Sequence, residues 1–163
     1  MNNYSFLEQL LHKPVLSSKF LKEMSFDLEK SYFLKYCGDY PDNHVFITGL
    51  ARSGTTILLN SIHQTDIFGS LSYDDMPFIL SPNLWSKING NGFQKESIER
   101  AHGDGIVISA SSPEAFEEVF WMTFKSDNEG LLDQFSEYVK LILYKKGKVR
   151  YLSKNNQNVK RID

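Results

Sequence analysis

Apolar residues recur at helical spacing in three stretches of this chain. The first covers residues 4–12 and ends before Pro14. The second, residues 17–36, carries a stripe formed by Phe20, Leu21, Met24, Leu28 and Leu34. The third has one apolar face, formed by Leu131, Leu132, Phe135, Tyr138, Val139 and Ile142. Lys145, Lys146 and Gly147 follow and are typical of a helix end. Because such spacing places apolar side chains on one face, each stretch is predicted to be a helix.

Short apolar runs of strand length separate these helices. They cover residues 45–48, 106–108 and 149–153. We predict three further helices. One passes through Leu84 and Trp85, one begins at Ser112-Pro113-Glu114 and has Glu117 and Glu118 on its exposed face, and one begins at Asn156. The first strand is predicted to be buried on both faces, as in a parallel sheet. The alternation of strands and helices therefore indicates an α/β fold with a parallel sheet flanked by helices.

The segment after the first strand combines the residue types of an anion-binding loop. Gly49 to Thr56 reads G-L-A-R-S-G-T-T, and Ile57, Leu58, Leu59 and Ile62 follow as the buried side of a helix that Ser53 or Thr55 would cap. A helix N-terminus offers unpaired N–H groups, and glycines let the backbone approach an anion closely. We therefore predict that a phosphate-like group is bound by Arg52, Ser53, Gly54, Thr55 and Thr56.

One position of this loop decides which anion it suits. The spacing matches a Walker A loop, but Thr55 occupies the position of the Walker lysine. That lysine contacts the β- and γ-phosphates of a nucleoside triphosphate that is bound with magnesium. The loop is therefore predicted to bind a donor with a single 5′ anhydride and without a metal.

The run from Phe46 to Thr56, F-I-T-G-L-A-R-S-G-T-T, resembles the 5′-phosphosulfate loop of sulfotransferases that use 3′-phosphoadenosine-5′-phosphosulfate (PAPS). Residues 99–121 and 151–162 are also similar to segments of bacterial sulfotransferases, the second being their strand-lysine-helix segment. The chain differs at Ala51, where most members have proline, and at Asn155 and Asn156, where K-x-P is usual. The resemblance covers residues 44 to 162 and implies a P-loop-like fold.

The resemblance also implies an activity and its residues. A sulfuryl group would pass from PAPS to a hydroxyl or amine of a small-molecule or saccharide acceptor. Lys154, just past the strand of residues 149–153, would meet the same donor group as Arg52 at one edge of the parallel sheet. There it would contact the bridging oxygen and help the leaving group depart. The base would be Asp75 or His102, with Glu99 as a third candidate. The alternatives are that Asp75 caps a helix before Met76-Pro77, that His102 packs beside the turn of residues 103–105, and that Lys154 is a solvated surface lysine.

A chain of 163 residues is predicted to form one domain, with N-terminal helices in residues 1–43 and the α/β core in residues 44–163. In sulfotransferases, a strand and helix after the lysine segment carry an arginine and a serine that hold the 3′-phosphate of PAPS. Because the sequence ends at Asp163, we expect the fold to be incomplete at the C-terminus and the chain to be an N-terminal portion.

Charge and composition limit the partners and the compartment. With 18 basic and 20 acidic residues, the chain has a net charge of −2, so it has no overall attraction to nucleic acid or to an anionic membrane. Cys37 is the only cysteine, which excludes an internal disulfide. No apolar run approaches the roughly 20 residues of a membrane span. We expect a cytoplasmic protein without nucleic-acid or membrane partners, and the oligomeric state stays open.

Two other functions are compatible with the loop. A P-loop kinase or NTPase is disfavoured by Thr55 and by the lack of a Walker B acid at the end of an apolar strand. A catalytically silent nucleotide-binding module would keep the loop without group transfer. Binding of adenosine 3′,5′-bisphosphate compared with ATP and magnesium separates the first of these from a sulfotransferase.

Overall fold

The computed structural model describes residues 17–50, 52–88, 98–99, 107–108, 113–125 and 130–161. The predicted helix of residues 4–12 lies outside these ranges. The described helices are α2 (Lys19–Phe33), α3 (Thr55–His63), α4 (Pro82–Ile88), α5 (Glu118–Phe124) and α6 (Leu131–Lys146), with 3₁₀ helices η1 (Leu34–Tyr36), η2 (Tyr73–Asp75) and η3 (Asn156–Arg161). The described strands are β1 (Val45–Ile47), β2 (Phe68–Gly69), β3 (Ile98–Glu99), β4 (Val107–Ile108) and β5 (Arg150–Lys154).

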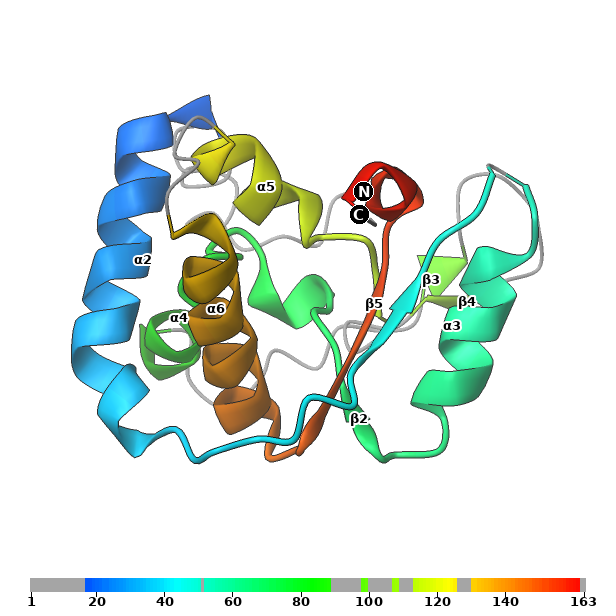
Figure 1. Ribbon diagram of the computed structural model, residues 1–163, viewed down its shortest axis with the longest axis horizontal. Coiled ribbons are helices and arrows are strands. Elements are labelled where there is room, and N and C mark those ends of the chain that lie inside the picture. The colour runs from blue at the N-terminus through cyan, green and yellow to red at the C-terminus, as the bar shows by residue number, and fades with distance from the viewer. Residues whose placement is uncertain are drawn as a thin grey trace.

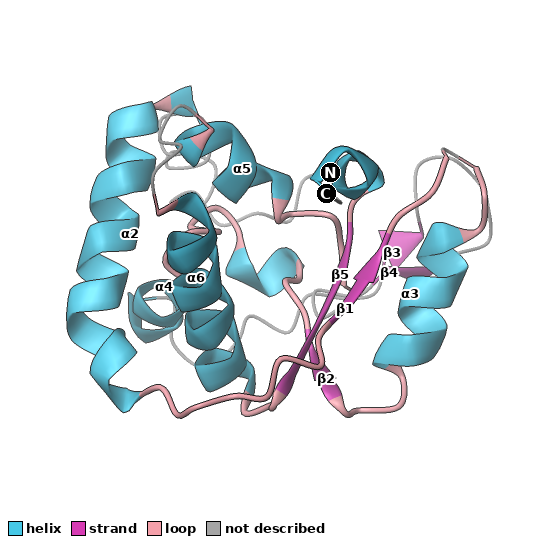
Figure 2. Ribbon diagram, viewed as in Figure 1, coloured by secondary structure: helices cyan, strands magenta, loops and turns pink. Residues whose placement is uncertain are grey.

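Three of the strands form a small parallel sheet in the order β1-β5-β2 (Figure 2). In its register, Val45 pairs with Leu152 and Ile47 with Lys154. β4 does not join this sheet, although the strand at residues 106–108 was predicted from the same alternation; it pairs in antiparallel fashion with β3. The fold is therefore α/β, with a parallel sheet flanked by helices.

Helices cover the two faces of the parallel sheet (Figure 1). On one face, α3 contributes Leu59 to a small apolar cluster with Ile47 and Leu152. On the other face, α2, α4, α5 and α6 surround a larger cluster that includes Tyr151 of β5. Because successive side chains of a strand point to opposite faces, β5 contributes to both clusters.

β1 lies at the edge of the parallel sheet, within the part of the chain that the structure describes. Its central residue, Phe46, keeps 45% of its surface exposed. The prediction that this strand is buried on both faces is therefore wrong. A short apolar run cannot by itself distinguish a central strand from an edge strand, since the difference depends on which strand becomes its neighbour.

α2 turns a different face to the core from the one its apolar stripe predicts. Phe20 is 69% exposed, and Met24 and Leu28 are also exposed. The buried positions are instead Phe26 and Phe33, and the ring of Phe26 packs edge-on against Tyr138 at 5.9 Å. The helix therefore places Phe26 and Phe33, which the predicted stripe omits, in the large core cluster.

Glu29 lies between Phe26 and Phe33 in the sequence and is buried with them. A carboxylate on the buried face of α2 interrupts the apolar pattern from which that face is predicted. Glu29 is fully buried and accepts hydrogen bonds from the backbone N–H groups of Asn83 and Leu84, at 2.8 and 2.9 Å, and from the Asn83 side chain at 2.7 Å. It thereby satisfies the free N–H groups at the start of α4. Burial raises the pKa of Glu29, and these hydrogen bonds oppose that rise.

α5 begins at Glu118, five residues after Pro113, the first helical position that the sequence predicts. Pro113 instead forms an isolated bridge with Ser72, and the Glu114 N–H donates to the Leu71 carbonyl at 3.1 Å. Glu117, which the sequence places on an exposed helix face, is buried. Its carboxylate accepts hydrogen bonds from Trp121 Nε1 at 2.8 Å and from the Tyr151 hydroxyl at 3.2 Å, so it joins α5 to the sheet.

Candidate functional site

The loop between β1 and α3 is a compact turn that depends on Gly49. A Cβ on this residue would lie 2.9 Å from Ser53 Oγ and 3.0 Å from Thr55 Cγ2, too close without a shift of these groups. Both the backbone N–H and the hydroxyl of Ser53 donate to the Leu50 carbonyl, at 3.2 and 2.7 Å. The turn therefore brings Ser53 and Thr55 back over the end of β1.

α3 begins without a side-chain cap. Its N-cap residue is Gly54, with φ +81°, and no side chain accepts a hydrogen bond from the first turn. The expected capping by Ser53 or Thr55 is therefore wrong, because the Ser53 hydroxyl donates within the turn instead. The first intrahelical bond from this cap runs from Leu58 N–H to the Gly54 carbonyl. The N–H groups of the first turn that come before Leu58 are thus directed toward the loop, as is the positive end of the helix dipole.

Arg52 has an unusual backbone conformation in this loop. Its φ of +69° lies in the left-handed region, which non-glycine residues other than asparagine and aspartate adopt uncommonly. The residue is exposed. Backbone strain of this kind collects at ligand-binding loops, where the surrounding structure holds it in place. The position keeps a long, forked cation next to the start of α3.

Lys154 reaches the same place from a strand about a hundred residues further along the chain. It is the last residue of β5, and its ammonium group lies 3.2 Å from Thr56 Oγ1. The two strands run parallel, and the Asn155 N–H donates to the Ile47 carbonyl at 3.0 Å. The prediction that Lys154 and the loop meet at one edge of the sheet is confirmed.

Asn155, the residue after Lys154, has a structural role in the described chain. It is buried, and its side-chain amide donates to the carboxylate of Glu118. The same carboxylate accepts a hydrogen bond from Arg161 at 2.9 Å, and the Arg161 guanidinium lies over the Trp121 ring at 4.7 Å. These contacts fix η3 directly beyond Lys154. No motif in the sequence indicated Arg161.

Asp75 lies in a buried ion-pair cluster. Its carboxylate is fully buried and contacts Lys145 at 2.5 Å and Lys146 at 2.9 Å. It also accepts a hydrogen bond from the backbone of Ser72 at 2.7 Å, in a capping box at the start of η2. Burial alone would raise the pKa of Asp75, but Lys146 and Lys145 outweigh burial and hold it below its ordinary value.

Asp75 therefore takes part in a capping box as the third residue of η2, whose N-cap is Ser72, and does not cap a helix that begins at Met76-Pro77. Its role as the catalytic base stays a prediction. His102 lies outside the described residues. For Glu99, the structure defines only its position in β3, paired with Val107.

Comparisons with protein-family models, with curated proteins and with solved structures gave no match. Within the described ranges, no group of three or more histidine, cysteine, aspartate or glutamate side chains is arranged to hold a metal ion. None of the helices in the described part of the chain is both long and apolar enough to cross a membrane. The function is therefore inferred from the geometry of the loop and of Lys154.

Proposed function

We propose that the chain is a sulfotransferase, or the N-terminal part of one, whose P-loop-like core binds the 5′-phosphosulfate group of PAPS at the start of α3. The observation that carries this proposal is the 3.2 Å distance between the Lys154 ammonium and Thr56 Oγ1. It brings a second cation to a glycine-lined helix N-terminus that already has Arg52 beside it. Two cations and the amides of one helix turn suit a compact, doubly anionic group.

The residues have separate tasks in this proposal. The Thr55 and Thr56 amides and the Arg52 guanidinium hold the 5′-phosphate of the donor. An acceptor oxygen attacks the sulfur and gives its proton to a base, for which Asp75 and His102 are the predicted candidates. The bond from sulfur to the bridging oxygen breaks, and adenosine 3′,5′-bisphosphate leaves with the electron pair. Lys154 stabilises the charge that develops on that oxygen.

Thr55 is the feature that favours a PAPS donor over a nucleoside triphosphate. Its position at the start of α3 supplies an amide and a hydroxyl but no cation toward β- and γ-phosphates. Lys154 approaches from the neighbouring strand instead. The acceptor would be a small molecule or a saccharide, and Cys37 as the sole cysteine fits a reducing compartment, so we place the reaction in the cytoplasm.

Substitution of Arg52 by alanine tests the anion site. We expect the affinity for adenosine 3′,5′-bisphosphate to fall roughly 10- to 150-fold, since a hydrogen bond to a charged group contributes about 1.5–3 kcal/mol. Arg52→Lys keeps the charge but loses the fork, so we expect a smaller loss. Isothermal titration calorimetry on the whole chain measures both variants against the wild type.

A parallel titration with ATP and magnesium distinguishes the donor classes. The proposal predicts weaker binding of ATP with magnesium than of adenosine 3′,5′-bisphosphate. Tighter binding of ATP that depends on magnesium would favour a P-loop NTPase. Unchanged affinity for adenosine 3′,5′-bisphosphate in Arg52→Ala would contradict the role of this arginine.

A further inference from the structure

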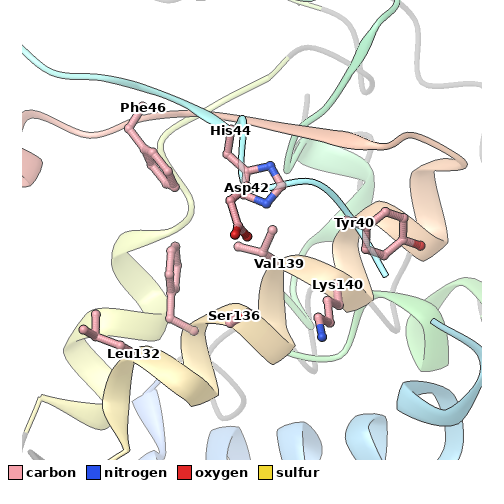
Figure 3. A pocket seen from close by; sticks show the side chains of 9 residues that line it. Tyr40, Asp42, His44, Phe46, Leu132, Ser136, Val139 and Lys140 are labelled. Carbon is pink, nitrogen blue, oxygen red and sulfur yellow. The ribbon is translucent and has the colours of Figure 1, made fainter. Parts of the chain in front are cut away.

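A pocket of about 150 Å³ lies between α6 and the segment that leads into β1 (Figure 3). Figure 3 shows Phe46, Asp42 and His44 on one side of the pocket and Leu132, Val139 and Lys140 of α6 on the other. The pocket is smaller than the roughly 300–1,000 Å³ of sites for drug-sized ligands. A cavity of this size accommodates a single six-membered ring.

This pocket is separate from the anion site. Phe46 packs against Tyr151, with ring centroids 5.8 Å apart, on the face of the sheet that carries α6. Ile47, the next residue of β1, belongs to the cluster beside α3 on the other face. Lys154 pairs with Ile47 and meets α3, so it lies on that other face as well. A ligand in the pocket and a donor on the loop would occupy opposite sides of β1.

The wall formed by residues 42–44 is anchored to β5. Arg150 Nε donates to the Asn43 carbonyl at 2.8 Å, and the Tyr151 N–H donates to His44 Nδ1 at 3.1 Å. Because Nδ1 is an acceptor, the neutral imidazole carries its proton on Nε2. Burial, assisted by Arg150 and opposed by Asp42, lowers the pKa of His44, which keeps the ring neutral at pH 7.

The chemistry of the lining changes along the pocket. One part is aromatic, where Phe46 and Phe135 lie with ring centroids 6.2 Å apart. Among the residues that line the pocket, Asp42 and Lys140 supply one charge of each sign, and His44 is neutral. A complementary ligand carries one aromatic ring together with both an ammonium and a carboxylate group.

We propose that this pocket binds an aromatic amino acid as a zwitterion, with its ring against Phe46 and Phe135, its carboxylate on Lys140 and its ammonium on Asp42. This inference does not depend on the proposed transfer reaction. A ligand of this size in a partly exposed pocket is expected to bind with a millimolar dissociation constant.

Three probes separate the contributions of the ring and the two charges. L-Phenylalanine carries both charges, phenethylamine only the ammonium, and 3-phenylpropanoate only the carboxylate. Lys140→Met should weaken L-phenylalanine and 3-phenylpropanoate about tenfold and leave phenethylamine unchanged. Asp42→Asn should weaken L-phenylalanine and phenethylamine by about the same factor and leave 3-phenylpropanoate unchanged.

The measurement is a titration of the whole chain followed by nuclear magnetic resonance. Lys125→Met, which removes an exposed lysine at the end of α5, is the matched control and should leave all three affinities unchanged. Lys140→Met should also leave adenosine 3′,5′-bisphosphate binding unchanged, and melting curves confirm that each variant is folded. The proposal is overturned if L-phenylalanine does not bind saturably, or if both pocket variants bind it like the wild type.

Discussion

Replacement of Asp75 by asparagine is expected to lower the free energy of unfolding by about 3 kcal/mol. The substitution keeps the shape of the side chain but leaves Lys145 and Lys146 without their shared anion. Removal of one partner from a buried ion pair costs about 3–5 kcal/mol. We expect the lower end of that range because the two lysine side chains keep 15% and 21% exposure. Urea denaturation of the wild type and the variant measures the difference.

The effect of Asp75→Asn should depend on pH in a defined direction. The folded-state pKa of Asp75 lies below its ordinary value of 3.8, so its ionised form contributes fully above that pH. The contribution is lost as the pH falls through the folded-state pKa. The difference between variant and wild type should therefore be largest near neutral pH and shrink in acid.

Asp66→Asn is the matched control for this substitution. Asp66 also pairs with a lysine, Lys148, at 2.6 Å, but its side chain is 89% exposed. Exposed ion pairs contribute little, so this variant should unfold like the wild type. A stable Asp75→Asn variant that has lost only transfer activity would contradict the structural role and support Asp75 as the base.

Lys154→Met should reduce kcat of sulfuryl transfer about 100- to 1,000-fold, the effect of removing one donor that stabilises transition-state charge. Methionine keeps most of the apolar stem at the end of β5, so packing changes little. The charge on the bridging oxygen grows mainly in the transition state, and donor affinity should therefore change less than kcat. Release of adenosine 3′,5′-bisphosphate from PAPS, with a panel of hydroxyl acceptors, measures the rate.

Lys160→Met provides the comparison for this result. Lys160 is exposed on η3, close in sequence to Lys154 but not at the end of the strand. We expect this variant to transfer at the wild-type rate. Equal rates for Lys154→Met and Lys160→Met would show that the contact between Lys154 and Thr56 has no part in transfer.

Elements that follow from a local sequence pattern could be predicted from the sequence. The loop of residues 49–56 and the strand before Lys154 were both predicted, and parallel pairing was enough to predict that they meet. α6 was also predicted, since its apolar face and terminal Gly147 follow ordinary helix rules.

Contacts between distant parts of the chain could not be predicted in this way. Asp75 meets lysines 70 residues further on, and Glu29 meets α4 more than 50 residues away. Each of these buried carboxylates looks like a surface residue until its partners are placed. Glu117 was assigned to an exposed face for the same reason, because its partner Tyr151 lies on a strand 34 residues away.

A structure of the chain bound to adenosine 3′,5′-bisphosphate would show whether the loop and Lys154 form one donor site. We expect the 5′-phosphate to lie within hydrogen-bond distance, about 3 Å, of the Thr55 and Thr56 amides, with Arg52 and Lys154 both in contact with it. A 5′-phosphate bound elsewhere, or at the loop but out of reach of Lys154, would contradict the proposed donor site.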